Sequence, residues 1–275
     1  AKLCAGFDDE YWFDRDHTGD FPIEFHKAMA DGGWLGIAMP EEYGGANLGV
    51  TEAALMMHQV ARAPGAMSAA SAIHINIFGP HSIVVFGNDE QKQRWIPDLV
   101  QGNLLTCFGV TEPDAGLNTT KLKTRAERSG NGYVVNGKKI WTTTAQEASK
   151  ILLLARTTAV EDCKSPTDGL SLFYTDLDRK YCDIREIEKM GRKSVDSNEV
   201  FFDGLPVPLE DRIGEEGMGF RYILHSLNPE RVLIGMEAVG IGQNALARAV
   251  KYAQDRVVFD RPIGQNQSIQ HPLAE

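Results

Sequence analysis

A carboxylate that could remove a proton stands at the start of a long amphipathic segment. Glu230 and Arg231 directly follow Asn228 and Pro229. Asn accepts amide hydrogen bonds at a helix N-cap and Pro suits the first helical position, so these residues predict a helix start. A carboxylate in a first turn complements the helix dipole, which is a purely structural role. Inside a closed apolar pocket its pKa would rise, which would suit Glu230 to act as a general base on a carbon-bound proton.

Two further segments combine backbone donors, hydroxyls and an aromatic ring. Residues 107–116 read Cys-Phe-Gly-Val-Thr-Glu-Pro-Asp-Ala-Gly, a strand that runs into a turn of small residues. Such a turn presents N–H groups and a hydroxyl to a ligand, although it also serves as a plain strand exit. Residues 141–144 read Trp-Thr-Thr-Thr at a strand end. The ring could pack on a flat cofactor whose edge a hydroxyl binds, or the threonines could simply be exposed strand residues.

A last segment, residues 256–267, follows the long helical pattern. Arg256 could bind a phosphate through its planar guanidinium fork, or complement the negative end of the helix. The sequence contains no GxGxxG or P-loop, and its histidines show no metal-ligand spacing. We therefore expect no metal site.

The elements that position these segments begin with helices. Residues 51–62 carry apolar side chains at helical spacing, and Asn88 is a cap for the next such stretch. Strand-like runs follow, together with an Asn136-Gly137 hairpin signal. No amphipathic helix separates the runs, which favours an antiparallel β domain over a doubly wound sheet. The strand-like runs are 151–154, 170–174 and 200–202. From Val232 onward helical spacing resumes on one apolar face, as in the first helix of a bundle.

Composition excludes several classes of protein. The 275 residues include 28 Lys and Arg against 38 Asp and Glu, a net charge of −10, which argues against a general nucleic-acid binder. The four cysteines form no CxxC pair and are expected to be reduced thiols. We expect no membrane span and no signal peptide. Because the chain opens without Met and closes inside a helical pattern, we expect a fragment clipped at both ends.

Taken in order, these segments resemble the flavin-dependent acyl-coenzyme A dehydrogenase family. The matching stretches are Pro40–Gly45, Phe86–Lys92, Gly109–Gly116, Asn136–Trp141, Met190–Lys193, Glu230–Arg231 and Arg256–Leu273. The resemblance implies an α+β fold with a helical domain over 1–105, a barrel-like antiparallel β domain over 106–215, and the start of a four-helix bundle over 216–275. It implies FAD between the β domain and the bundle, with help from a neighbouring subunit of a homodimer or homotetramer.

The resemblance also implies an activity, partners and a location. The substrate would be an acyl-CoA thioester, which is dehydrogenated to the trans-2-enoyl thioester, and an electron-transfer flavoprotein would take up the electrons. The protein would work in a bacterial cytoplasm or a mitochondrial matrix. Other readings on the same scaffold are a flavin oxidase that returns electrons to oxygen and a member of the DNA-alkylation-response type without dehydrogenase activity. The fragment alone is expected to retain FAD weakly.

Individual roles follow from the resemblance, position by position. Residues expected at the flavin are Phe108, Val110, Thr111, Trp141, Thr142 and Thr143. Residues expected to reach the FAD of a neighbouring subunit are Arg256, Phe259 and Gln267. Residues expected at the substrate are Leu117, Asn228 and Arg231. Leu117 replaces a serine that many members carry and cannot supply its hydroxyl. Glu230 is the base in a minority of members, whereas most take the base from a C-terminal region beyond residue 275.

Overall fold

The N-terminal part is an assembly of helices in a computed structural model that describes all residues 1–275. The helices are α1 (Asp9–Thr18), α2 (Ile23–Asp31), α3 (Val50–Arg62), α4 (Ala66–Phe78), α5 (His81–Phe86) and α6 (Asp89–Val100). The predicted cap at Asn88 is confirmed: its side chain accepts a hydrogen bond from Gln91 N at 2.8 Å, and Gln91 Oε1 accepts one from Asn88 N at 3.0 Å. This reciprocal capping satisfies two amide groups that the first turn leaves free.

The helical core forms around α4. Every residue of this helix from Ala69 to Phe78 is buried, and Ile73 packs with Phe25 and Met57 in one apolar cluster. The stretch Ala66–Phe86 is long and apolar enough to cross a membrane, contrary to the expectation from the sequence, but 78% of its most apolar window is buried inside the protein. Its hydropathy is therefore accounted for by contacts with neighbouring helices and strands.

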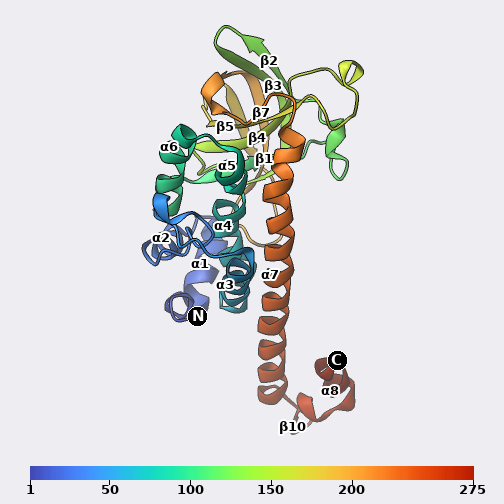
Figure 1. Cartoon of the computed structure of the whole chain (residues 1–275). Helices are drawn as coiled ribbons and strands as arrows, with labels where there is room; N and C mark the ends of the chain where they lie inside the picture. Colours follow the sequence, from blue (N-terminus) through green and yellow to red (C-terminus); the bar gives the residue numbers. More distant parts are fainter.

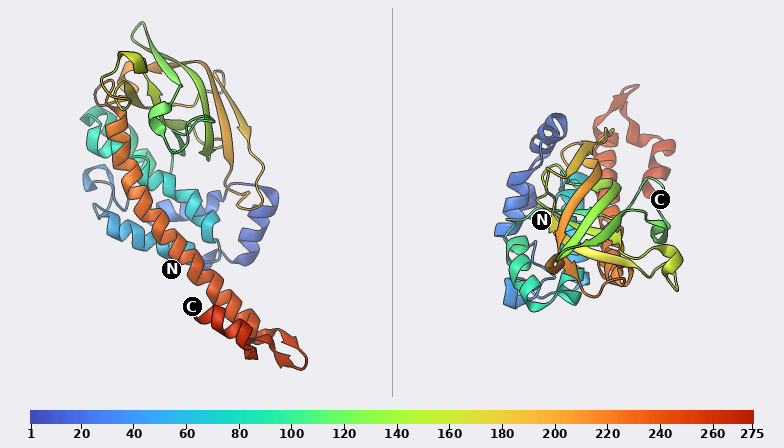
Figure 2. Two further views of the ribbon diagram at one scale, coloured as in Figure 1. Left: turned by 90° about the vertical axis from the view of Figure 1, so that its right-hand side faces the viewer. Right: turned by 90° about the horizontal axis from the view of Figure 1, so that it is seen from above.

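A mostly antiparallel sheet follows the helices. Its strands are β1 (Thr106–Gly109), β2 (Arg125–Ser129), β3 (Gly132–Thr143), β4 (Lys150–Arg156), β5 (Leu170–Asp176), β6 (Cys182–Glu186), β7 (Ser197–Pro208) and β8 (Arg212–Ile213). The order is β6-β7-β3-β2-β4-β5-β8, and β1 pairs with β4 in parallel. The predicted fold class is thus confirmed, with parallel pairings of β1 and β2 to β4 inside the sheet. Figures 1 and 2 show the sheet beyond one end of the helical part.

The hairpin signal at Asn136-Gly137 was wrong about the place of the turn. β3 continues through both residues, and the chain reverses at Gly130-Asn131, so that Ser129 pairs with Gly132. Gly137 instead marks a register shift against β7, with φ 149° and with Thr124 so close that a Cβ would meet it at 2.6 Å. A bulge, like a tight turn, favours a residue that has no side chain. The glycine that suggested a turn at Asn136-Gly137 therefore marks a bulge instead.

The long helix α7 covers Gly219–Asp255, about 55 Å along its axis. The start predicted at Asn228 was wrong by nine positions, and Pro229 lies inside the helix. Tertiary contacts override the proline penalty. Tyr222 and Ile223 are buried against the sheet, and the buried Ser226 hydroxyl donates to the Gly79 carbonyl at 2.9 Å. The first two turns are thereby held in place by α5, the α4–α5 junction and β5.

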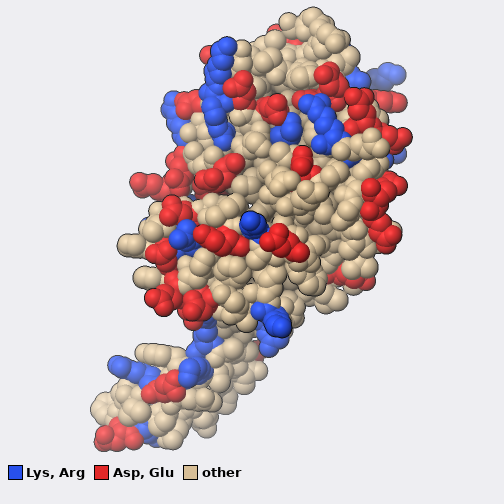
Figure 3. Space-filling view, turned by 90° about the vertical axis from the view of Figure 1, so that its left-hand side faces the viewer, with Lys and Arg blue, Asp and Glu red and all other residues tan.

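The second half of α7 projects away from the rest of the molecule, as Figures 1 and 2 show. It exposes apolar side chains such as Val239, Leu246 and Val250. Beyond it lie the short strands β9 (Val257–Val258) and β10 (Arg261–Pro262) and the helix α8 (Gln267–Ala274). On the face that Figure 3 shows, acidic side chains are interspersed with basic ones, without a continuous basic stripe.

Candidate functional site

The ends of β1 and β3 lie side by side. The Ile140 amide donates to the Thr111 carbonyl at 2.9 Å, and Lys139 Nζ donates to the Val110 carbonyl at 3.0 Å. These two bonds join residues that are 29 positions apart in the sequence. They place Val110 and Thr111 next to the strand end that carries Trp141.

A buried ion pair fixes this junction. Lys139 is fully buried and its Nζ lies 2.9 Å from Glu112 Oε1. Burial lowers the pKa of Lys139 to about 8, against the opposing effect of Glu112. Burial tends to raise the pKa of Glu112, but Lys139 and hydrogen bonds from the amides of Lys123 and Thr124 outweigh it, so this pKa is lowered. Neither residue was assigned a role from the sequence, although a lysine in an apolar strand is a visible signal.

Trp141 presents its ring to the surface at the end of β3. Its φ of 61° coincides with a register shift between Lys139 and Thr142, and 59% of the residue is exposed. The half-buried hydroxyls of Thr111 and Thr143 make no hydrogen bond within the protein. An exposed indole on a strand that also carries Thr143 and is hydrogen-bonded to Thr111 fits a flat ring with a hydrogen-bonding edge.

The other residues expected at a flavin are placed differently. Val110 is buried, and Phe108 is partly buried between the helical core and the sheet core. Thr142 is fully buried, with Oγ1 unpaired and its carbonyl accepting from Asn198 Nδ2 at 2.9 Å. Its side chain is therefore covered by protein, unlike that of Trp141.

A second group of polar side chains lies where α4 meets α7. Glu230 is half-buried, and burial raises its pKa, an effect that His74 and Arg231 oppose and Glu237 supports. Glu237 is fully buried and neither of its carboxylate oxygens has a hydrogen-bond partner. Its Oε1 lies 3.4 Å from His74 Nδ1, which is also unpaired. Sequence reasoning missed His74 and Glu237; the available signal was a carboxylate among the apolar residues of α7.

Aromatic contacts connect the two groups. The Phe108 ring lies 5.6 Å from that of Phe78, and the Phe78 ring lies 5.5 Å from that of His74, measured between centroids. The side chains of α4 therefore connect Phe108 in β1 with the polar group around His74 and Glu230. The pKa direction anticipated for Glu230 agrees with this environment.

The remaining sequence-predicted residues are spread over α7, the loop after β1 and the C-terminal segment. Arg231 donates to Asn228 Oδ1 at 2.6 Å on the exposed face of α7, and Leu117 is fully exposed on the loop after β1. Arg256, which caps α7, is separated from Glu230 by about 39 Å of helix. Phe259 and Gln267 lie in the hairpin and helix beyond it. Within a single chain, these three residues therefore lie at the far end of α7 and not next to Trp141.

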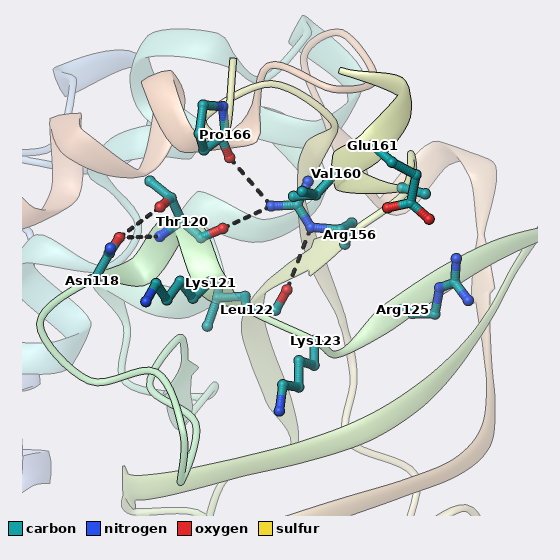
Figure 4. Close-up of a pocket in the computed structure, with 11 residues that line it drawn as sticks. Asn118, Thr120, Lys121, Leu122, Lys123, Arg125, Arg156, Val160, Glu161 and Pro166 are labelled. Carbon is teal, nitrogen blue, oxygen red and sulfur yellow. Dashed lines mark hydrogen bonds between the residues drawn. The ribbon is translucent and has the colours of Figure 1, made fainter. Parts of the chain in front are cut away.

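A basic pocket of about 730 Å³ lies beside the loop that follows Leu117, as Figure 4 shows. Arg156 is held inside it by backbone carbonyls, among them those of Thr120 at 3.0 Å and Pro166 at 3.3 Å. Lys121 and Arg125 stand at its wall with exposed side chains, and Arg125 has only a distant partner, Glu127 at 3.9 Å. Cations without close partners are available to an anionic ligand.

Known protein families match this chain along its length. Models of the N-terminal, middle and C-terminal domains of acyl-CoA dehydrogenases match residues 7–103, 107–205 and 217–275. The chain is 34% identical over its whole length to acyl-CoA dehydrogenase fadE12 of Mycobacterium bovis, of which it covers 70%. It is 32% identical over 94% of its length to the mitochondrial 2-methylacyl-CoA dehydrogenase of Solanum tuberosum, of which it covers 63%.

A solved structure adds a bound cofactor to this comparison. The glutaryl-CoA dehydrogenase of Mycobacterium smegmatis in complex with FADH2 superimposes with a TM-score of 0.83 at 29% identity. The match covers 96% of this chain and 64% of that one. The chain thus spans about two thirds of the length of these relatives.

Proposed function

Because the chain belongs to the acyl-CoA dehydrogenase family of flavin-dependent oxidoreductases, we propose that it serves the FAD-dependent α,β-dehydrogenation of an acyl-CoA thioester to the trans-2-enoyl-CoA. One observation carries the proposal for this chain: the exposed Trp141 ring lies at a strand end that is hydrogen-bonded to Thr111, with unpaired hydroxyls on Thr111 and Thr143. Electrons would pass to an electron-transfer flavoprotein. The relatives are bacterial and mitochondrial, so we expect a bacterial cytoplasm or a mitochondrial matrix.

Trp141, Thr111 and Thr143 are the residues that would hold the flavin ring, with Phe108 of β1 and Val110, directly after that strand, supporting them. Bound FAD would supply the redox chemistry by accepting a hydride equivalent from the β carbon. The protein would supply alignment and a dry surface, since Val110 and Phe108 are enclosed by the two cores. Thr142 would act from behind this surface because its side chain is buried.

Glu230 is the group within residues 1–275 that could hold the α proton. Its carboxylate is half-buried, and the raised pKa increases its affinity for a proton. Asn228 and Arg231 lie on the same turn and would bind the thioester end of the substrate. The rival base is a carboxylate supplied from sequence beyond residue 275, which the Glu230→Gln variant discussed below distinguishes.

The basic pocket, whose lining includes Asn118 directly after Leu117, would receive the phosphates of coenzyme A. Lys121 and Arg125 have the charge for this role, and Leu117 would cover the ligand with apolar surface in place of a hydroxyl. Arg256, Phe259 and Gln267 would complete the FAD site of a neighbouring subunit, in a homodimer or homotetramer. Their separation from Glu230 by the length of α7 supports a role outside their own chain.

The proposal is tested with full-length protein loaded with FAD. Anaerobic addition of short, branched and long acyl-CoAs should bleach the flavin absorbance, and the product should be the enoyl-CoA. Trp141→Ala should weaken FAD binding about fivefold, because an aromatic stacking contact of about 1 kcal/mol is lost. Trp34→Ala, at an exposed tryptophan of the helical part, is the matched control. No bleaching by any acyl-CoA would refute the proposed reaction.

A further inference from the structure

Glu237 is a buried carboxylate that lacks donors. The residue is 1% exposed, and neither Oε1 nor Oε2 accepts a hydrogen bond. A buried carboxylate without donors is strongly destabilising, so such a group is expected to acquire a partner in the working protein. The nearest candidate, His74 Nδ1, lies 3.4 Å away and is itself unpaired. The two groups are thus within ion-pair distance of each other, but neither makes a hydrogen bond within the chain.

The side chains around this pair do not supply that partner. Arg192, in the loop between β6 and β7, is close enough to feel the charge of Glu237, but its guanidinium donates to Ser71 at 2.9 Å and Ser197 at 3.0 Å. Leu233, one turn before Glu237, is buried in the helical core. The Phe78 ring borders His74 on the other side. The pair is thus bordered by the apolar Leu233 and Phe78 and by the Arg192 guanidinium, whose donors are engaged by two serines.

The location of the pair relates it to the candidate base. Glu237 follows Glu230 by two helical turns on the same side of α7, about 10 Å along the axis. His74 and Glu237 both influence Glu230 electrostatically. An acyl chain whose α carbon lies at Glu230 and that extends along α7 would bring its distal part to this pair.

We propose that Glu237 and His74 recognise a hydroxyl group on the acyl chain of the substrate, so that the preferred substrates are hydroxylated acyl-CoAs. The hydroxyl would donate to a Glu237 carboxylate oxygen and exchange a second hydrogen bond with His74 Nδ1, which donates or accepts according to its tautomer. The inference rests on the proposed function. A chain that ends in a carboxylate would be repelled by Glu237, and a purely apolar chain would leave both groups unpaired.

The test compares matched substrates on full-length, FAD-loaded protein. Straight-chain acyl-CoAs from butyryl to decanoyl and their ω-hydroxy counterparts are offered anaerobically, and kcat/KM for flavin reduction is measured. At the chain length that reaches the pair, the hydroxylated member should be favoured about ten- to hundredfold, as for a hydrogen bond to a charged group. Glu237→Leu should abolish or reverse this preference, and His74→Phe should reduce it. Glu127→Leu, at an exposed carboxylate of β2, should leave it unchanged.

The possible failures are distinguishable. If no acyl-CoA bleaches the flavin, the proposed function and this inference both fall. If both members of every pair bleach it equally well, only the inference is overturned. Thermal unfolding adds a second readout: Glu237→Leu should raise or preserve the midpoint, because it removes an unpaired buried carboxylate. A fall in the midpoint, also seen with Glu237→Gln, would show that a protein donor pairs with Glu237 in the full-length chain and would overturn the inference.

Discussion

Lys139 Nζ lies 2.9 Å from Glu112 Oε1 in the interior of the sheet domain, and the same ammonium donates to the Val110 carbonyl at 3.0 Å. This relationship ties the end of β1 to β3 at the point where the proposed flavin surface begins. Glu112 in turn accepts from the amides of Lys123 and Thr124. The pair therefore positions the segment Val110–Thr111 from behind.

Removal of one partner of this pair should be costly. Lys139→Met leaves Glu112 charged and buried, and we expect a loss of about 3–5 kcal/mol in the free energy of unfolding. The matched control is Lys138→Met, which breaks the half-exposed pair with Glu199 and should cost less than about 1 kcal/mol. Denaturant titration measures both. The double variant Lys139→Met with Glu112→Gln should recover part of the loss. Equal losses of stability in Lys139→Met and Lys138→Met would contradict the role assigned to Lys139.

Glu230→Gln should separate activity from stability. Burial raises the pKa of Glu230 above its ordinary 4.5, so the folded state favours the protonated form. The contribution of Glu230 to the free energy of unfolding is fully present below pH 4.5 and is lost as the pH rises through the folded-state pKa of this residue. The Gln variant should therefore unfold at a higher temperature than wild type near neutral pH and at about the same temperature near pH 4.

The kinetic result for this variant assigns the base. If Glu230 holds the α proton, flavin reduction by acyl-CoA should fall by at least about a hundredfold in Glu230→Gln, as for loss of a general base. Glu215→Gln, at an exposed carboxylate, is the control. An unchanged rate of flavin reduction would move the role to a carboxylate beyond residue 275.

Arg256 offers a test of shared sites between subunits. Trp141→Ala and Arg256→Glu should each impair FAD retention in the full-length oligomer, since they remove a stacking ring and a phosphate-binding cation. When the two variants are co-expressed, mixed oligomers should regain flavin, because one of their sites combines an intact Trp141 with an intact Arg256. Flavin absorbance per subunit after purification through two different tags measures this. Retention no better than in the parents would place both residues at one chain's own site or assign Arg256 a structural role.

His26 should govern part of the acid sensitivity of the helical domain. Burial lowers its pKa from 6.5 to about 4, so the folded state keeps the ring neutral. The unfolded chain takes up a proton first as the pH falls, and stability should therefore decrease between pH 6.5 and about pH 4, by about 3 kcal/mol at most. In His26→Gln this decrease should be smaller, whereas His17→Gln on the exposed end of α1 should follow wild type. Thermal melts across this pH range provide the comparison.

Local chemistry allowed much of the architecture to be read from the sequence. The cap at Asn88, the apolar spacing of α3 and the runs that became β4, β5 and β7 depend on residues within a few positions of one another. The motifs around Thr111, Trp141 and Glu230 were recognisable for the same reason. Where tertiary contacts compete with local preference, the reading was wrong: burial of Tyr222 and Ile223 extends α7 past Pro229, and a bulge takes the place of the turn at Gly137.

Only the tertiary structure paired residues that are distant along the chain. His74 is one of several isolated histidines in the sequence, and Glu237 one acidic residue in a helical pattern, yet α4 and α7 bring them to 3.4 Å. Burial also decided their chemistry, because a carboxylate that is harmless in water is costly where no donor reaches it. The sequence motifs thus indicated the family by resemblance, and the patterning of residues indicated the order of helices and strands. Packing decided which of those residues meet and what the enclosed ones require from a ligand.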